Sequence, residues 1–187
     1  MADTRILALV GSLRGASVNR QLAELAAESS SDGVEVTIYE GLGEGLGDLP
    51  FYNEDIDSAD PAEVPASVAA LRSAAAQADA ALVITPEYNG SIPGVLKNAI
   101  DWLSRPFGNG ALQDKPVAVI GAAGGRYGGV WAHDETRKSI GIAGPRVVES
   151  ITLSLPIASL DGRHPRDNAE VVANVRAAVG KLVAEVS

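Results

Sequence analysis

Short, continuous runs of apolar residues recur along the chain and separate longer segments with helical periodicity. Residues 5–10 (RILALV) are apolar after the first position, and the run ends at Gly11. Runs of this kind are typical of strands that are buried on both faces of a sheet. Further strands are predicted at residues 34–39, 80–85, 116–121 and 147–155.

Amphipathic segments follow these runs. Residues 18–28 place Val18, Leu22, Leu25 and Ala26 on one helical face. Further helices are predicted at residues 64–75, 93–103, 130–141 and 171–186. Pro93 would open its helix, because proline is favoured in the first helical turn. The helix at 130–141 is only loosely amphipathic, and we expect its half-polar surface to face a partner subunit.

Five strands, each followed by a helix, imply a parallel sheet with right-handed crossovers. The chain has 187 residues, which fits a single domain over residues 1–187, although length alone also allows two small domains. Five units fit the flavodoxin-like strand order 2-1-3-4-5 better than the six-stranded Rossmann order. We therefore predict an α/β fold: a flavodoxin-like three-layer sandwich with a five-stranded parallel sheet.

Composition excludes several classes of function. The chain has no cysteine, which excludes thiol nucleophiles, zinc–thiolate sites and iron–sulfur clusters. It carries 24 acidic and 15 basic side chains, a formal net charge of −9, so its surface repels nucleic acid and anionic lipid. It shows neither an apolar run of about 20 residues nor a secretory signal pattern. We expect a cytoplasmic protein with no nucleic-acid partner and no membrane insertion.

The loop after the first strand has the composition of a phosphate site. Ligands of doubly wound sheets bind beyond the carboxyl ends of the strands, where the strand order reverses. Here Ser12, Arg14, Ser17 and Asn19 precede a helix whose N-terminus offers unpaired N–H groups. Arginine binds phosphate oxygens bidentately, and hydroxyl and amide groups add neutral hydrogen bonds. The alternative is that Ser17 is simply the N-cap of the helix.

Two more loops reach the same predicted edge. Residues 85–93 (TPEYNGSIP) form a stiff, proline-bounded segment whose backbone amides suit the edge of a flat heteroaromatic ring. Residues 121–129 (GAAGGRYGG) are rich in glycine, which lets the backbone approach a ligand closely. Each loop alone could be a structural turn or a flexible connection. Three such loops at one sheet edge favour a ligand site.

Other site patterns are missing from the sequence. It has neither a Walker loop nor the dinucleotide pattern G-x-G-x-x-G, and Ser91 lacks the G-x-S-x-G spacing of a hydrolase nucleophile. It has no cluster of metal-ligating side chains in sequence. His133 and His164 are the only histidines, and we expect both to be structural or exposed to solvent.

The motifs at 11–19 (GSLRGASVN), 86–106 (PEYNGSIPGVLKNAIDWLSRP) and 121–129 resemble the NAD(P)H-dependent FMN reductase family, which includes quinone, chromate and azo-dye reductases. The resemblance implies non-covalent FMN, hydride transfer from NADPH or NADH to the flavin, and delivery of electrons to a small acceptor such as a quinone, chromate, an azo or nitro compound, or free flavin. It also implies a homodimer or homotetramer, with residues 97–105 near the interface.

The same resemblance implies the cofactor-binding residues. The FMN phosphate would be held by Ser12, Arg14, Ser17 and Asn19. The ribityl chain and the ring would be lined by Pro86, Glu87, Tyr88, Asn89 and Gly90. The other side would be closed by Gly124, Gly125 and Arg126. No catalytic side chain and no metal are predicted, because the flavin itself carries the redox chemistry. Glu87 is expected to be structural or to orient the ring rather than to donate a proton.

Two alternatives stay open. A flavodoxin-type electron carrier would bind FMN without turning over NAD(P)H. The tandem repeat at residues 40–47 (EGLGEGLG) is interpreted as a loop insertion without chemistry, or else as a segment that shapes the edge of the cleft.

Overall fold

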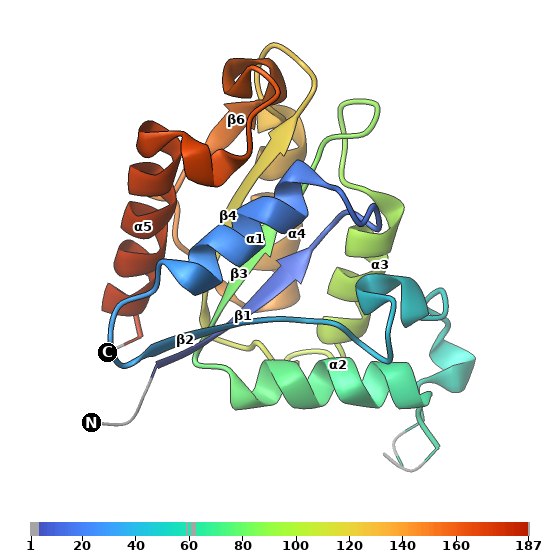
Figure 1. Cartoon of the computed structure of the whole chain (residues 1–187). Helices are drawn as coiled ribbons and strands as arrows, with labels where there is room; N and C mark the ends of the chain where they lie inside the picture. Colours follow the sequence, from blue (N-terminus) through green and yellow to red (C-terminus); the bar gives the residue numbers. More distant parts are fainter. Residues whose placement is uncertain (1–3, 59, 61–62, 187) are drawn as a thin grey trace.

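The computed structural model describes residues 4–58, 60 and 63–186, and a parallel sheet lies at its centre (Figure 1). The strands run in the order β2-β1-β3-β4-β5, and β6 pairs with β4 beyond the end of β5. Their bounds are β1 Thr4–Val10, β2 Val34–Ile38, β3 Ala80–Ile84, β4 Pro116–Ala123, β5 Arg146–Val147 and β6 Ser154–Pro156. The predicted strand order is confirmed, and the sheet has one strand more than expected.

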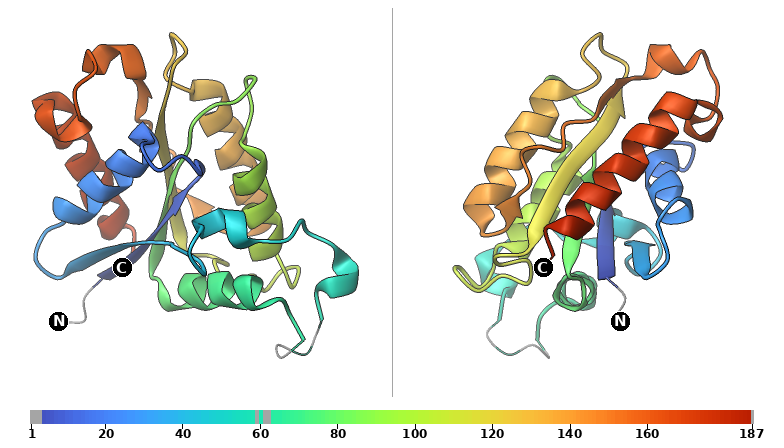
Figure 2. Two further views of the ribbon diagram at one scale, coloured as in Figure 1. Left: turned by 45° about the vertical axis from the view of Figure 1, so that its right-hand side comes forward. Right: turned by 90° about the vertical axis from the view of Figure 1, so that its left-hand side faces the viewer.

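Helices cover both faces of the sheet. Their bounds are α1 Val18–Glu28, α2 Ala66–Gln77, α3 Gly94–Leu103, α4 Val130–Ala143 and α5 Ala169–Ala184. Helices α1 and α5 pack in one hydrophobic core, and α2, α3 and α4 contribute to the other. Figure 2 shows the two layers of helices on opposite sides of the strands. The three-layer sandwich is therefore as predicted.

The continuous apolar runs are explained by these two cores. In β1, Ile6 and Ala8 pack toward α1 and α5, whereas Leu7 and Leu9 pack toward the opposite layer. Successive side chains of a strand point to opposite faces, so a strand covered on both sides needs apolar residues at every position. Each fully buried leucine or isoleucine contributes about 1.5–3 kcal/mol relative to an exposed one.

The predicted continuous strand at 147–155 is wrong. The chain pairs with β4 as β5, leaves the sheet, and pairs with β4 again as β6. Helix α4 inserts the Arg137 guanidinium at this gap, where Nη2 donates to the carbonyl oxygens of Val119 (2.9 Å) and Ile151 (3.2 Å). A side chain thus satisfies two carbonyl groups in the gap between β5 and β6.

Helix α4 is half-polar in part because three of its polar residues, His133, Thr136 and Arg137, are buried. Asp134, Glu135 and Lys138 lie on its exposed side, and the expected contact of this helix with a partner subunit stays a prediction. Several other boundaries differ by one or two residues from expectation, among them those of α3 and α5. Pro93 is the N-cap of α3 rather than its first helical residue, and α5 begins and ends two residues earlier than predicted.

Candidate functional site

The loops that follow β1, β3 and β4 begin side by side at the carboxyl edge of the sheet. The N–H of Gly11 donates to Ile84 O (2.9 Å), and the N–H of Thr85 donates to Ile120 O (3.0 Å). At Gly121, a Cβ atom would lie 2.0 Å from Thr85 O. Only glycine allows this approach, so the loops after β3 and β4 leave the sheet in contact.

The loop after β1 forms a cradle of free donors. Ser17 is the N-cap of α1, and its Oγ accepts a hydrogen bond from Asn19 N (3.2 Å), which leaves its hydroxyl hydrogen free to donate. Within the part of the chain that the structure describes, the backbone N–H groups of Leu13, Gly15 and Ala16 make no hydrogen bond. Free N–H groups at a helix N-terminus suit an anion.

Arg14 belongs to this loop and is exposed, and its guanidinium forms no hydrogen bond or ion pair with the described residues. Ser12 Oγ accepts from Arg14 N at 3.4 Å, which helps to shape the loop. The donor set of hydroxyl, backbone and guanidinium groups, without a neutralising carboxylate on Arg14, fits a phosphate group.

Asn19 connects the loop to β4. Its Nδ2 donates to Ala122 O and its Oδ1 accepts from Ala122 N, both at 2.8 Å. The side chain is buried, so the amide is used to tie the start of α1 to the strand that carries the third loop. The structure therefore gives Asn19 protein partners at the place where the sequence predicted a contact with a phosphate.

The loop after β3 ends in a tight hairpin turn. Asn89 and Gly90 have φ angles of 54° and 74°, and Tyr88 and Ser91 pair across them through two backbone hydrogen bonds of 3.1 and 3.0 Å. A two-residue turn with positive φ at both positions strongly favours Asn-Gly. The turn fixes Tyr88 at the rim, where its ring is half-exposed.

The same loop has free backbone donors and a carboxylate that is engaged elsewhere. Among the described residues, the N–H groups of Glu87, Asn89 and Gly90 have no hydrogen-bond partner. Glu87 Oε2 accepts from the N–H groups of Trp131 (3.1 Å) and Ala132 (3.2 Å) in the first turn of α4. A carboxylate at a helix N-terminus is stabilised by the helix dipole, so Glu87 holds the loop against α4.

Gly124, Gly125 and Arg126 are exposed at the tip of the loop after β4. A Cβ atom at either glycine would meet nothing within 4 Å, so the backbone here is open to a ligand. The Arg126 guanidinium lies 5.3 Å from the centre of the Tyr127 ring.

His133 links three parts of the site. Its Nε2 lies 2.9 Å from Thr85 O, and its Nδ1 lies 2.7 Å from Ser154 Oγ. Because a carbonyl oxygen only accepts, Nε2 carries the hydrogen, and Nδ1 of the neutral ring accepts from the serine hydroxyl. The ring therefore joins α4 to the end of β3 and to β6.

Burial lowers the pKa of His133. The hydrogen bond to Thr85 opposes this effect, and the positive charge of Arg137 adds to it. The charges of Glu87 and Asp134 favour the protonated form but are smaller contributions. His133 is thus held neutral at physiological pH, as a structural group, which agrees with the sequence prediction. His164 caps a short 3-10 helix away from these loops, accepting from Arg166 N.

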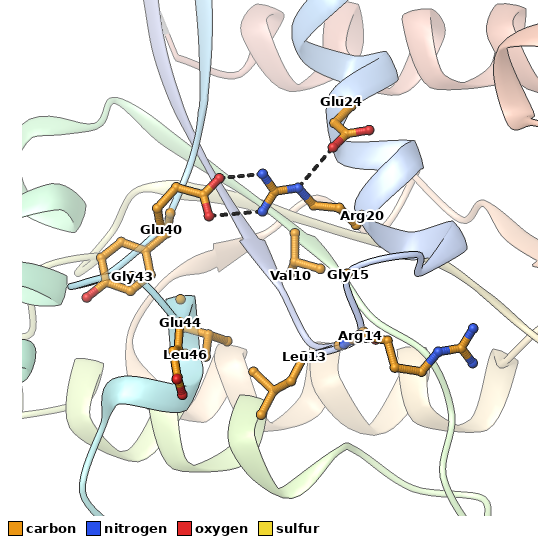
Figure 3. Close-up of a pocket in the computed structure, with 13 residues that line it drawn as sticks. Val10, Leu13, Arg14, Gly15, Arg20, Glu24, Glu40, Gly43, Glu44 and Leu46 are labelled. Carbon is orange, nitrogen blue, oxygen red and sulfur yellow. Dashed lines mark hydrogen bonds and ion pairs between the residues drawn. The ribbon is translucent and has the colours of Figure 1, made fainter.

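The repeat at residues 40–47 borders a cleft of about 370 Å³ beside the cradle. Figure 3 shows Arg20 between Glu40 and Glu24, with the Arg14 side chain directed away from that cluster. Arg20 donates to Glu40 (Nη1–Oε2 3.0 Å) and to Glu24 (Nε–Oε1 3.1 Å). The repeat therefore shapes a cleft edge, on the β2 side of β1 rather than between the loops after β3 and β4.

The model of one protein family, described as NADPH-dependent FMN reductase, matches residues 4–159. The chain belongs to this family. A quinone reductase of Pseudomonas putida is 42% identical over 135 residues, which cover 72% of this chain and 68% of the relative. A 2-hydroxy-1,4-benzoquinone reductase of a Burkholderia species is 40% identical over 133 residues, covering 71% and 68%.

Among solved structures, FerB of Paracoccus denitrificans, a flavoenzyme NAD(P)H:(acceptor) oxidoreductase, superposes with a TM-score of 0.83. It is 30% identical and the match covers 98% of this chain and 97% of FerB. Membership of the FMN reductase family confirms the resemblance and the predictions of an oxidoreductase enzyme, of FMN and of NAD(P)H. The cradle around Arg14 and the free N–H groups of the two other loops fit this cofactor chemically.

The sequence patterns did not reveal the contacts of two buried residues that support the candidate site. Arg137 and His133 lie in the half-polar helix, and their inward orientation depends on contacts with strands far along the chain. Regular spacing of polar residues in α4 is the only local signal, and it does not distinguish an inward from an outward face.

We predict that His133 makes stability depend on pH. Its pKa is lower in the folded than in the unfolded protein, so the unfolded state binds the proton more readily. Stability is complete above the unfolded pKa of about 6.5 and falls as the pH drops below it, by at most about 1.4 kcal/mol per pH unit. Urea unfolding at pH 5.5 and 7.5 measures this slope, which should be smaller in His133→Gln. An equal slope in both proteins would contradict the prediction.

Proposed function

We propose that this protein is an NAD(P)H-dependent reductase of quinone-type acceptors that works through bound FMN. The observation that carries the proposal is the meeting of three loops with free backbone donors at one sheet edge, with an unpaired arginine in the first loop. The chain also belongs to the FMN reductase family, and its relatives include named quinone reductases.

In this proposal, each of the three loops contacts a different part of FMN. Ser12, Arg14 and Ser17 bind the phosphate, and Asn19 keeps their loop in place through Ala122. The segment Pro86, Glu87, Tyr88, Asn89 and Gly90 lines the ring, where its free N–H groups stabilise negative charge on the reduced flavin. The opposite side is bordered by Gly124 and Gly125, and Arg126 lies at the outer edge of the same loop. Glu87 acts as a positioning residue, because its carboxylate is bound to the N-terminus of α4.

When bound, FMN supplies the redox chemistry by taking a hydride from the nicotinamide and passing two electrons to the acceptor. The overall reaction is quinone + NADPH + H⁺ → hydroquinone + NADP⁺. The protein contributes binding, orientation and electrostatics, which agrees with a site built from backbone donors rather than from a general acid and base.

A visible spectrum tests the function. The protein is loaded with FMN, freed of excess flavin and mixed anaerobically with NADPH or NADH. We expect the flavin band to bleach and to return when 1,4-benzoquinone is added. Flavin that is retained but is bleached by neither nucleotide would instead indicate a flavodoxin-type electron carrier. Failure to retain or turn over FMN would exclude both.

Arg14→Ala should weaken FMN binding about 10- to 100-fold, because it removes charge-assisted hydrogen bonds to the phosphate. Fluorescence titration with FMN measures the effect, and circular dichroism checks that the fold is intact. Arg176→Ala is the matched control, since Arg176 is an exposed arginine of α5 far along the chain from the cradle. Equal FMN affinity in the two variants would remove Arg14 from the phosphate site.

We also propose that the whole chain acts as one domain in a homodimer or homotetramer in the cytoplasm. No helix among the described residues has the length and apolar character needed to cross a membrane.

A groove of about 560 Å³ between α3 and α4 is bordered by Phe107 and Ile142, which are 86% and 74% exposed. Large exposed apolar residues of this kind often mark interfaces.

Sedimentation velocity tests the assembly. We expect the native protein to sediment as a dimer or tetramer at micromolar concentration, and Phe107→Glu to shift it toward the monomer by placing a charge in the apolar interface. Phe51→Glu is the control, because Phe51 is equally exposed at 85% but lies outside this groove. A native protein that sediments as a monomer would contradict the proposal.

A further inference from the structure

Three exposed residues form a continuous surface group beside the candidate flavin site. The Tyr127 and Trp131 rings lie 5.7 Å apart at a tilt of 57°, and the Arg126 guanidinium lies 5.3 Å from the centre of the Tyr127 ring. Tyr127 is 53% exposed and Trp131 is 56% exposed. We refer to Arg126, Tyr127 and Trp131 together as the aromatic rim.

The aromatic rim borders both loops that are proposed to hold the flavin ring. A Cβ atom on Gly90 would lie 3.9 Å from Cε3 of Trp131, so the indole lies beside the hairpin turn at residues 88–91. The backbone of Trp131 is held by Glu87 of the same loop. Arg126 continues directly from Gly124 and Gly125 at the tip of the next loop. A ligand that leaves the flavin ring across this edge therefore meets the rim.

Arg126 contributes a positive charge that the protein does not neutralise. Several other arginines of this acidic chain are paired with carboxylates, among them Arg20, Arg72 and Arg146. In the part of the chain that the structure describes, Arg126 has only the contact with the Tyr127 ring. Stacking on an aromatic face places a guanidinium while its N–H donors stay available to a ligand.

Building on the proposed function, we propose that the aromatic rim binds the adenylate half of NADPH, with the adenine on Trp131 and Tyr127 and a phosphate on Arg126. Adenine is a flat π system that stacks on aromatic side chains. Phosphates are the ligands that the bidentate donors of arginine match best. A neutral quinone would stack on the two aromatic rings but would leave the Arg126 guanidinium without an anionic partner. The complete aromatic rim therefore fits a nucleotide better than a quinone.

This assignment gives the unpaired arginines of the first and third loops separate ligands. Arg14 faces the FMN phosphate in the first loop, and Arg126 faces the dinucleotide at the opposite side of the ring. It also changes the role of Arg126, which the family resemblance placed among the contacts to FMN. Its exposure and its contact with Tyr127 set the guanidinium at the outer edge of the loop.

Tryptophan fluorescence tests the proposal directly. The chain has two tryptophans, and Trp102 is fully buried whereas Trp131 is exposed. The FMN-loaded protein is titrated with adenosine 2′,5′-bisphosphate, which carries the adenine and phosphates without the nicotinamide. We expect a saturable change in the emission of Trp131. Calorimetry should then show about tenfold weaker binding of this probe to Trp131→Ala and to Arg126→Gln, with Trp131→Phe close to the parent because it keeps a stacking ring.

Kinetics provide the second measurement. In Trp131→Ala and Arg126→Gln, KM for NADPH should rise about tenfold, while KM for 1,4-benzoquinone and the affinity for FMN stay within twofold of the parent. A higher KM for the quinone alone would assign the rim to the acceptor. Weaker FMN binding would assign it to the flavin, and a loss of oligomer in sedimentation would assign it to a second copy of the chain. Each of these results overturns the proposal, whereas failure of both NADPH and NADH to bleach the FMN-loaded parent protein would overturn the proposed function itself.

Discussion

Helix α4 holds the two sides of the candidate site together through polar contacts made by its first two turns. Its first-turn N–H groups bind Glu87, His133 binds the carbonyl of Thr85, and Glu135 Oε2 accepts from Ser91 Oγ at 2.6 Å. All three partners belong to the segment that leaves β3. The position of that segment relative to the loop after β4 is therefore set by one helix, and the flavin ring is proposed to lie between them.

The buried side of α4 carries the polar side chains of His133 and Arg137. A buried polar group without a hydrogen bond costs about 1–3 kcal/mol, so each must find a partner. The His133 ring has partners at both nitrogens, and the two Arg137 Nη atoms bind Asp134, Val119 and Ile151, while its Nε has no hydrogen-bond partner. By contrast, the free N–H groups gather in the exposed loops at the carboxyl edge, where a ligand or water can satisfy them. Apart from Arg137 Nε, these buried side-chain groups have hydrogen-bond partners among the described residues, whereas the N–H groups at the edge are open to the proposed ligand.

Local pattern was sufficient for the parts of the fold that depend on periodicity. Continuous apolar runs gave four of the strands, and the sites at their carboxyl ends follow from topology alone. The segment 147–155 misled because apolar residues such as Ile151 are buried in an irregular segment just as they would be in a strand. The carbonyl of Ile151 is bound there by Arg137 from another element, a contact that no local pattern reveals. Likewise, sequence predicted that Asn19 lies at the cofactor loop, but only the structure shows that its amide binds Ala122, 103 residues away.

The positions of the charged side chains limit where an anionic nucleotide can bind to this acidic chain. A chain with a net charge of −9 repels anionic nucleotides at long range, so local cations must offset that repulsion where phosphates bind. The nearby Arg20 cannot do so, because Glu40 and Glu24 engage its guanidinium and hold its pKa above the ordinary value. Arg14 and Arg126 differ in having no carboxylate partner among the described residues. Because these two arginines lie in loops that follow different strands, they place positive charge at two separate points of the proposed site, as two phosphate-bearing ligands require.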